Sequence, residues 1–255
     1  MSATQFIDTY NLRARLWPAI LGIAPAIALA AIAVSWDELS LPQVIATAAI
    51  AVLFGAASDL ARRMGKRFER KMFASTGGKP VMTLLRHSDG TLETRTKDRY
   101  RNFLAQQLQE QPPTAEDETR DPAAANGFYD RCGIWLRERT RRDTGKFKVL
   151  FEENVTYGFR RNLYGLRWPG LTLNALVVSI CTYLLSPYGS WISETTRTEI
   201  FAVLTIAALH AAYFLFFVTR RSVEEASDQY ARQLVLSCEG VMANGTANSR
   251  TSPVS

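Results

Sequence analysis

Four long runs without a charged side chain constrain this chain more than any other feature. They cover residues 16–36, 39–58, 168–193 and 200–219. Each offers enough residues, at about 1.5 Å of helical rise per residue, to cross a hydrocarbon layer of about 30 Å. The near-zero mean hydropathy of the chain averages these runs with strongly charged segments. The sequence therefore predicts an integral membrane protein with four transmembrane helices.

The order of the runs predicts an all-α protein with a helical domain inserted between two transmembrane hairpins. The first two runs are joined by Asp37-Glu38, and the last two by a short polar stretch. The expected segments are a lead at 1–15, a first hairpin at 16–58, a helical domain at 59–167, a second hairpin at 168–219, and at 220–255 a helix with a disordered tail.

Lysine and arginine residues are distributed unevenly around these runs, and this asymmetry predicts orientation. Only Arg197 lies on the side of the two short connections. The other flanks carry Arg13, Arg15, Arg62, Arg63, Lys66, Arg67, Arg70, Lys71, Arg160, Arg161, Arg167, Arg220 and Arg221. Because positive charge is retained in the cytoplasm, we expect a multi-pass protein of the cell membrane with both termini and the insert cytoplasmic. The same cations are expected to contact anionic lipid.

Local signals divide the insert into helices. Residues 146–168 carry apolar side chains at helical spacing, end in a basic cluster with Trp168, and therefore predict an amphipathic helix that leads into the third run. Thr94 or Thr96 is expected to cap a helix that reaches about residue 110. Thr114 with Asp117 predicts a capping box, and Asp121-Pro122 predicts the start of a further helix.

Two groups of arginines in the insert are candidates for binding an anionic ligand or a protein partner. They are Arg137, Arg139, Arg141 and Arg142 at one helix end, and Arg160 and Arg161 in the amphipathic helix. Cations at a helix C-terminus are equally explained by the helix dipole. If the two helices pack antiparallel, however, the groups converge, and guanidinium forks bind phosphate well. We do not expect nucleic acid, because topology and lipid binding already account for the basic residues near the membrane.

Polar side chains inside the last two runs are the second candidate site. Asn174 and His210 are expected to face the interior of the bundle, where they find hydrogen-bond partners. His210 lies near the middle of its uncharged run and is the ionisable group there. Two interpretations stay open: a neutral histidine bonded across the bundle, or a role in gating or proton movement.

Signals for catalysis or metal binding are weak. His87 and Asp89 are near neighbours in a predicted turn, and triads are defined by spatial geometry rather than by adjacency. Residues 116–118 form an acidic turn without a second ligand cluster, and the three cysteines lack ligand spacing. We therefore expect neither catalysis, nor a metal, nor a cofactor.

The layout is similar to that of bacterial membrane effectors of antiviral defence. This resemblance is one of architecture alone. The sequence favours a non-enzymatic membrane protein, expected to form a homo-oligomer, whose cytoplasmic domain senses an anionic ligand or protein partner and controls a channel-like or membrane-perturbing bundle. Two alternatives stay open: a passive membrane anchor or scaffold for a cytoplasmic partner, and an enzyme acting at the lipid interface.

Overall fold

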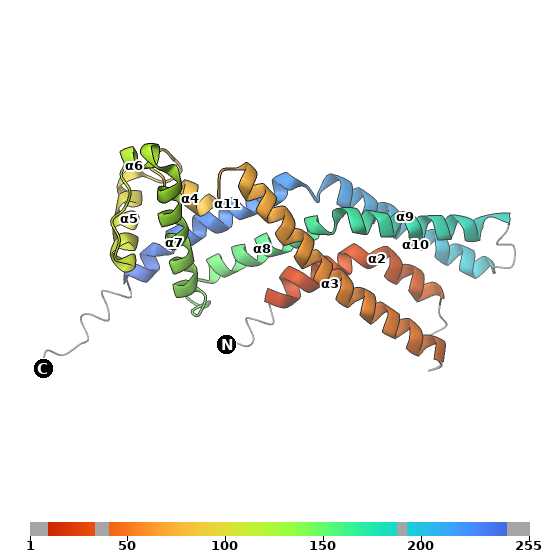
Figure 1. Ribbon diagram of the computed structural model, residues 1–255. Coiled ribbons are helices and arrows are strands. Elements are labelled where there is room, and N and C mark those ends of the chain that lie inside the picture. Colours follow the sequence, from red (N-terminus) through yellow and green to blue (C-terminus); the bar gives the residue numbers. More distant parts are fainter. Residues whose placement is uncertain (1–9, 34–40, 188–192, 244–255) are drawn as a thin grey trace, which may run out of the picture. The chain divides into compact units, whose positions relative to one another are not determined.

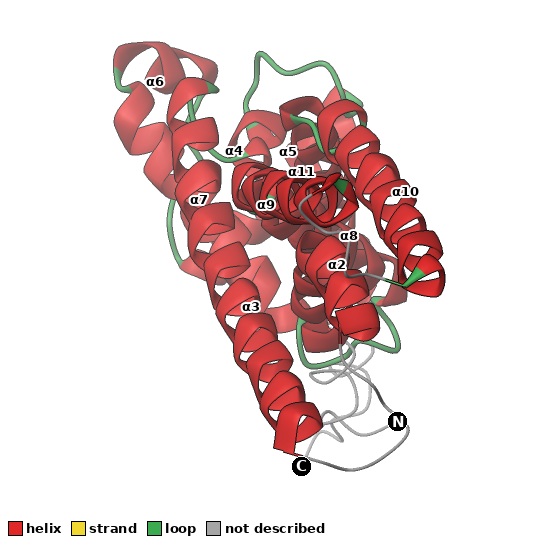
Figure 2. Cartoon of the chain, turned by 90° about the vertical axis from the view of Figure 1, so that its right-hand side faces the viewer, coloured by secondary structure: helices red, strands yellow, loops and turns green. Residues whose placement is uncertain are grey.

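The computed structural model describes residues 10–33, 41–187 and 193–243, and these residues form helices and loops with no β-strand among them (Figures 1 and 2). The all-helical prediction is therefore confirmed for this part of the chain. Some predicted segments lie outside the described residues. They are the first nine residues of the lead, the predicted disordered tail from residue 244, and parts of three uncharged runs (34–36, 39–40 and 188–192).

The helices follow one another along the whole described chain. A short π-helical segment, η1 (Leu12–Leu16), precedes α2 (Trp17–Ala33), α3 (Leu41–Ser75), α4 (Pro80–Leu85), α5 (Thr94–Leu108), α6 (Ala115–Arg120), α7 (Pro122–Thr140), α8 (Lys148–Gly165), α9 (Arg167–Leu185), α10 (Glu194–Phe216) and α11 (Arg220–Leu236).

Helix starts follow the predicted capping residues with one exception. Thr114 and Asp117 exchange the two hydrogen bonds of a capping box at α6, and the Asp121 carboxylate accepts from the Ala124 N–H, 3.0 Å away, at α7. The predicted threonine cap of α5 is wrong. Glu93 caps this helix, because its longer carboxylate reaches the N–H groups of Arg95 and Thr96.

Four helical stretches are long and apolar enough to cross a membrane. They are Leu12–Ile32, Gln43–Leu85, Arg167–Leu185 and Glu194–Phe216. α3 runs unbroken from this apolar stretch through the basic residues that follow it. How the stretches are arranged as hairpins across a membrane stays a prediction.

Internal contacts divide the chain into two compact units. Within the described residues, the insert unit contains residues 70–157 and 224–243, and the span unit contains residues 10–33, 41–69, 158–187 and 193–223. The limits of the two units fall inside α3, α8 and α11, each of which contributes residues to both.

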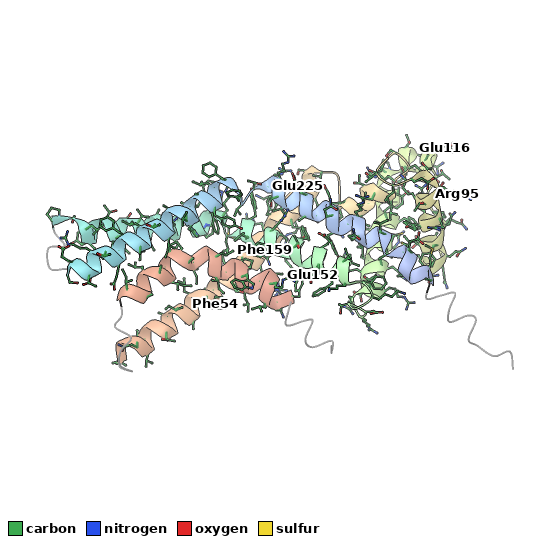
Figure 3. The ribbon with its side chains drawn as sticks, turned by 180° about the vertical axis from the view of Figure 1, so that it is seen from behind. Phe54, Arg95, Glu116, Glu152, Phe159 and Glu225 are labelled. Atoms are coloured by element: carbon green, nitrogen blue, oxygen red, sulfur yellow. The ribbon has the colours of Figure 1, made fainter. Side chains whose placement is uncertain are left out.

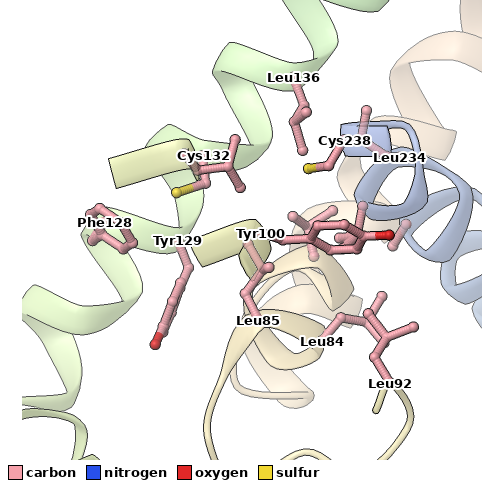
Figure 4. Close-up of a cluster of buried hydrophobic side chains, with 14 of the residues drawn as sticks. Leu84, Leu85, Leu92, Tyr100, Phe128, Tyr129, Cys132, Leu136, Leu234 and Cys238 are labelled. Carbon is pink, nitrogen blue, oxygen red and sulfur yellow. The ribbon is translucent and has the colours of Figure 1, made fainter. Parts of the chain in front are cut away.

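Large side chains from α4, α5, α7 and α11 fill the core of the insert unit (Figure 4). Tyr100, Leu104, Leu136 and Leu234 are buried completely or almost completely. The C-terminal helix α11 and the residues just after it pack against the insert, because Leu234, Val235 and Cys238 enter this core. Burial raises the pKa of the Cys132 thiol to about 12, so this thiol remains protonated at neutral pH.

Small residues bring the helices of the span unit together. α2, α9 and α10 pack pairwise, and α3 contacts α2 where Ala57 lies with Ala19 and Ile23. Phe54 packs beside this contact (Figure 3). Many large apolar side chains of the unit point outward instead, among them Val52, Phe201 and Leu209.

Candidate functional site

The C-terminal end of α8 and the residue that follows it lie against α3 and α2 of the span unit. α8 and α9 are separated by Leu166 alone, whose backbone is also in the right-handed helical region. A Cβ added to Gly165 would lie 2.5 Å from the Gly65 backbone nitrogen, so α3 and α8 cross at backbone contact. Leu166 in turn lies against Gly22 of α2. The predicted helix is confirmed as α8, and its end is held by small residues on two neighbours.

Polar side chains at this end of α8 bind three further elements. The Asn162 amide donates to the Ala14 carbonyl of η1, 2.7 Å away. Arg161 forms an ion pair with Glu69 of α3, with 3.0 Å between nitrogen and oxygen, and Arg160 donates to the Ser222 carbonyl of α11 at 3.1 Å. Only 12% of the Arg161 side chain and 21% of the Glu69 side chain are exposed, so solvent screens this pair weakly.

These contacts change the interpretation of Arg160 and Arg161. Both guanidinium groups have internal partners in the span unit that hold α8 in place, and their binding of an anion stays a prediction. Sequence reasoning missed Glu69 because it lies 92 residues from Arg161 and no spacing rule joins the two. The one signal was that Glu69 is an acidic residue within a basic stretch of α3.

The other four candidate arginines lie at the end of α7 in the insert unit and are exposed. Arg139 lies over the Trp135 ring, 5.4 Å from its centre, and Arg141 forms an ion pair with Glu138. The guanidinium groups of Arg137 and Arg142 form no ion pair with any residue in the described part of the chain. An open hollow of about 400 Å³ is lined by Trp135, Glu138, Arg139 and Arg142.

The two arginine groups thus belong to different units, and their convergence stays a prediction. The α7 group alone keeps the features of an anion site: exposed guanidinium groups, a helix C-terminus that concentrates cations, and an aromatic ring that fixes one of them.

Asn174 and His210 form a buried polar contact between α9 and α10. The Asn174 side-chain nitrogen lies 3.1 Å from His210 Nδ1 and donates to the Ala207 carbonyl at 2.8 Å. Phe214 stacks on the imidazole with 4.3 Å between ring centres. The predicted interior placement of both residues is confirmed, since Asn174 is 3% and His210 7% exposed. His210 lies six residues before the end of α10, nearer one end of the helix than the sequence suggests.

The hydrogen-bond donors at this contact determine which nitrogen of the His210 imidazole carries the proton. An amide NH₂ group can only donate, so Nδ1 accepts, and the neutral ring carries its proton on Nε2. Nε2 and the Asn174 Oδ1 are buried and have no hydrogen-bond partner within the described residues. The backbone of Leu21 and Gly22 borders the imidazole, so α2 approaches the same contact.

The weak catalytic candidates do not converge. His87 Nε2 lies 3.1 Å from the Pro113 carbonyl oxygen, whereas the Asp89 carboxylate accepts from Thr91. The Glu118 carboxylate accepts from the His87 backbone N–H and from the Tyr129 hydroxyl. The described residues contain no group of three histidine, cysteine, aspartate or glutamate side chains that could hold a metal.

Two buried cations of α5 were not identified from sequence. Lys97 donates to the Asp89 carbonyl, and Arg101 donates to the Leu85 carbonyl at the end of α4, 3.0 Å away. Burial lowers the pKa of Lys97. Both side chains hold the segment between α4 and α5, which is a structural role.

Comparison of the chain with protein-family models, curated proteins and solved structures finds no match. Functional inference therefore rests on the residues of this chain alone.

Proposed function

We propose that this chain is a non-enzymatic integral membrane protein whose insert unit senses an anionic ligand or a protein partner and controls the span unit. The span unit would act as a channel-like or membrane-perturbing bundle. The insert unit and both termini would lie in the cytoplasm, where the basic flanks of the uncharged runs favour them. We further propose that the bundle works as a homo-oligomer, as in the bacterial defence effectors whose layout it resembles.

The observation that carries this proposal is the path of α8. This helix begins among residues of the insert unit, and its end binds η1, α3 and α11 in the span unit. A change in the position of α8 would therefore act on three elements at once. α3 and α11 also contain residues of both units, so the insert unit is joined to the spans through helices rather than flexible linkers.

The arginines at the end of α7 supply the proposed sensing site. Arg137 and Arg142 can bind an anion without breaking an ion pair described above, and Arg139 and Arg141 lie within the same helix end. Phosphate chemistry suits such a group, because planar guanidinium forks bind its oxygens in pairs.

The test is dye and ion leakage from cells that express the full chain, with membrane insertion checked for every variant. The double variant Arg137→Gln/Arg142→Gln removes two cations of the sensing site. The matched control Arg95→Gln/Lys148→Gln removes two exposed cations elsewhere in the insert unit; Figure 3 marks Arg95. We expect leakage from the wild type and the control, and its loss in the α7 variant.

Equal leakage from all three chains would contradict sensing at α7. If no trigger causes leakage and a cytoplasmic protein co-purifies with the chain, the scaffold interpretation is favoured over the effector. A scaffold would also tolerate substitution of Asn174 and His210 when the fold survives, whereas a gated bundle would not.

A further inference from the structure

Pro25 interrupts the backbone hydrogen bonding of α2 inside the first apolar stretch. Proline has no N–H group, so the carbonyl of Leu21, four residues earlier, loses the partner that a regular helix would give it. In lipid no water replaces that partner, and a membrane helix tolerates proline where a neighbouring helix can satisfy the freed carbonyl. A donor for Leu21 is therefore expected on α9 or α10, which both pack against α2.

The other proline of α2 shows how this chain compensates such a loss. Pro18 cannot donate to the Ala14 carbonyl, four residues before it. Asn162 of α8 supplies a donor instead, since its amide lies 2.7 Å from that carbonyl oxygen. A side chain from a neighbouring helix thus serves the first freed carbonyl, and we expect the same arrangement for the second.

His210 of α10 brings a suitable donor to α2. The backbone of Leu21 and Gly22 borders its imidazole. Leu21 also packs against the cluster that contains Phe214, the residue whose ring stacks on that imidazole. The Nε2–H group is buried and has no hydrogen-bond partner among the described residues. A buried donor and a freed acceptor therefore lie in the same place between α2 and α10.

Asn174 determines that the donor is Nε2. Its amide nitrogen lies 3.1 Å from His210 Nδ1 and donates to the Ala207 carbonyl at 2.8 Å, so the amide has one favourable orientation. Because Nδ1 accepts, the proton of the neutral ring is on Nε2, the nitrogen that remains available to α2. Asn174 is therefore a positioning residue for this donor.

α2, α9 and α10 converge closely at the level of Gly22. A Cβ added to Gly170 of α9 would lie 3.2 Å from the Gly22 carbonyl oxygen and 3.3 Å from the Phe214 ring. Since no bulky side chain separates the helices here, a small rotation of α2 at Pro25 would align the Leu21 carbonyl with the imidazole N–H.

We propose that Pro25 and His210 form a latch between α2 and α10. In its closed state the His210 Nε2–H donates to the Leu21 carbonyl that Pro25 frees. In its open state, the arrangement described above, the two groups are neighbours without this bond. Closing gives both groups the partner that they lack and so stabilises the interior of the span unit, to which all these residues belong.

The latch also offers a way to gate the bundle, and this part alone rests on the proposed function. α2 follows η1 directly, and the Ala14 carbonyl of η1 accepts from Asn162 at the end of α8. A displacement of α8 would therefore reach α2 through η1. It would favour one state of the latch to the extent that α8 binds η1 differently in the two states.

Solid-state NMR on the full chain in liposomes tests the bond directly. Leucine is labelled with ¹³C at the carbonyl and histidine with ¹⁵N in the ring. The chain has two histidines, so the His87→Gln background, purified without a histidine tag, leaves His210 as the labelled imidazole. We expect a hydrogen-bonded Nε2–H with a through-space correlation to a leucine carbonyl that is lost in Leu21→Ile. A proton on Nδ1, or an Nε2–H without this correlation, would overturn the proposal.

The variants His210→Gln and His210→Asn separate the two ends of the imidazole. The glutamine amide can place an N–H near the position of Nε2, whereas the shorter asparagine reaches only the position of Nδ1, where it can still accept from Asn174. We expect His210→Asn to unfold about 2–5 °C below His210→Gln, because only the glutamine can still serve the Leu21 carbonyl. Thermal unfolding of the full chain in detergent measures this difference.

Replacement of the prolines shows whether the difference depends on the freed carbonyl. Pro25→Ala returns an N–H to Leu21, so the two His210 variants should unfold at the same temperature in this background. Pro18→Ala is the matched control, because it returns an N–H to Ala14 and should leave the difference unchanged. A difference that persists in Pro25→Ala, or that is missing while Pro25 is present, would contradict the latch.

The latch and the proposed function fail separately. NMR and unfolding are measured without leakage, so a chain that leaks in an arginine-dependent way but shows no bond to Leu21 retains the proposed function and loses the latch. If the bond forms and the latch gates the bundle, His210→Asn changes leakage relative to His210→Gln. Equal leakage from the two variants would remove the gating role.

Discussion

The insert unit and the span unit achieve close packing in opposite ways. The insert unit surrounds Tyr100, Tyr129 and Leu136 with other large side chains. The span unit brings α2 and α9 close together at Gly22 and Gly170, where an added Cβ on Gly170 would lie 3.2 Å from the Gly22 carbonyl oxygen, and leaves large apolar side chains on its outside. Water favours the first arrangement because burial of apolar surface drives folding. Lipid gives no such gain, so close approach of helices carries the stability.

Leucine side chains therefore contribute to the two units in different ways. A leucine in the insert unit stabilises by being buried, whereas many leucines of the span unit suit a lipid environment by being exposed. Each prediction below changes one unit, and the first two include a matched position as a control.

Truncation of a buried leucine should have the largest effect. Leu136→Ala opens a cavity in the insert-unit core and should cost about 2–5 kcal/mol of unfolding free energy. Leu176→Ala in α9 removes the same atoms from a side chain that is 57% exposed and should change stability by less than about 0.5 kcal/mol. Denaturant melts in detergent measure both. Similar losses of unfolding free energy in the two variants would contradict the proposed difference between the units.

Addition of one methyl group at the crossing of α3 and α8 should come next. Gly165→Ala places a Cβ 2.5 Å from the Gly65 nitrogen and should cost about 1–3 kcal/mol, because rigid backbone must move. At Gly55 no atom lies within 4 Å of the added Cβ, so Gly55→Ala should be tolerated. Thermal unfolding followed by circular dichroism compares the two. Unchanged stability of Gly165→Ala would show that the helices do not cross at contact.

Loss of the polar contact in the span unit should have a smaller effect. Hydrogen bonds between helices in lipid average about 0.6 kcal/mol and reach about 1.7 kcal/mol. A double-mutant cycle with Asn174→Leu and His210→Phe should give a coupling in this range. Additive costs would mean that the two side chains do not interact.

The last effect appears only at high pH. Burial and the hydrogen bond to Glu239 raise the pKa of Tyr100 from 10.0 to about 12. The folded state keeps a proton that the unfolded state releases, so this contribution is fully present below pH 10 and is lost as the pH rises through 12. Tyr100→Phe should make the alkaline fall in stability shallower, and melts between pH 9 and 12 test this. If the dependence of stability on pH is the same in Tyr100→Phe and the wild type, the Tyr100 hydroxyl is exposed to solvent.

Local signals predicted much of the fold. The caps of α6 and α7 depend on residues three positions apart, and the length of α3 follows from its uninterrupted helical pattern. The cap of α5 failed because two threonines and a glutamate compete within four residues, and the choice depends on side-chain reach.

Long-range partners could not be predicted. Arg161 was expected to be open to an anion, and its partner Glu69 becomes a neighbour only when α3 crosses α8 at Gly65 and Gly165. A cavity of the insert unit, lined by Met72 of α3 and Asp228 of α11 among others, likewise combines segments more than 130 residues apart. Burial of Asn174 and His210 was predictable, because polar groups in an apolar run have few other places to lie.

The discontinuous make-up of the insert unit has a consequence for biosynthesis. Its core needs Ala231, Leu234, Val235 and Cys238, which leave the ribosome after all four uncharged runs. Residues 70–157 must therefore wait with part of their apolar surface uncovered while the last spans are made. A nascent chain that stalls in α10 cannot complete this unit, so the insert unit is complete only after all four uncharged runs have been made.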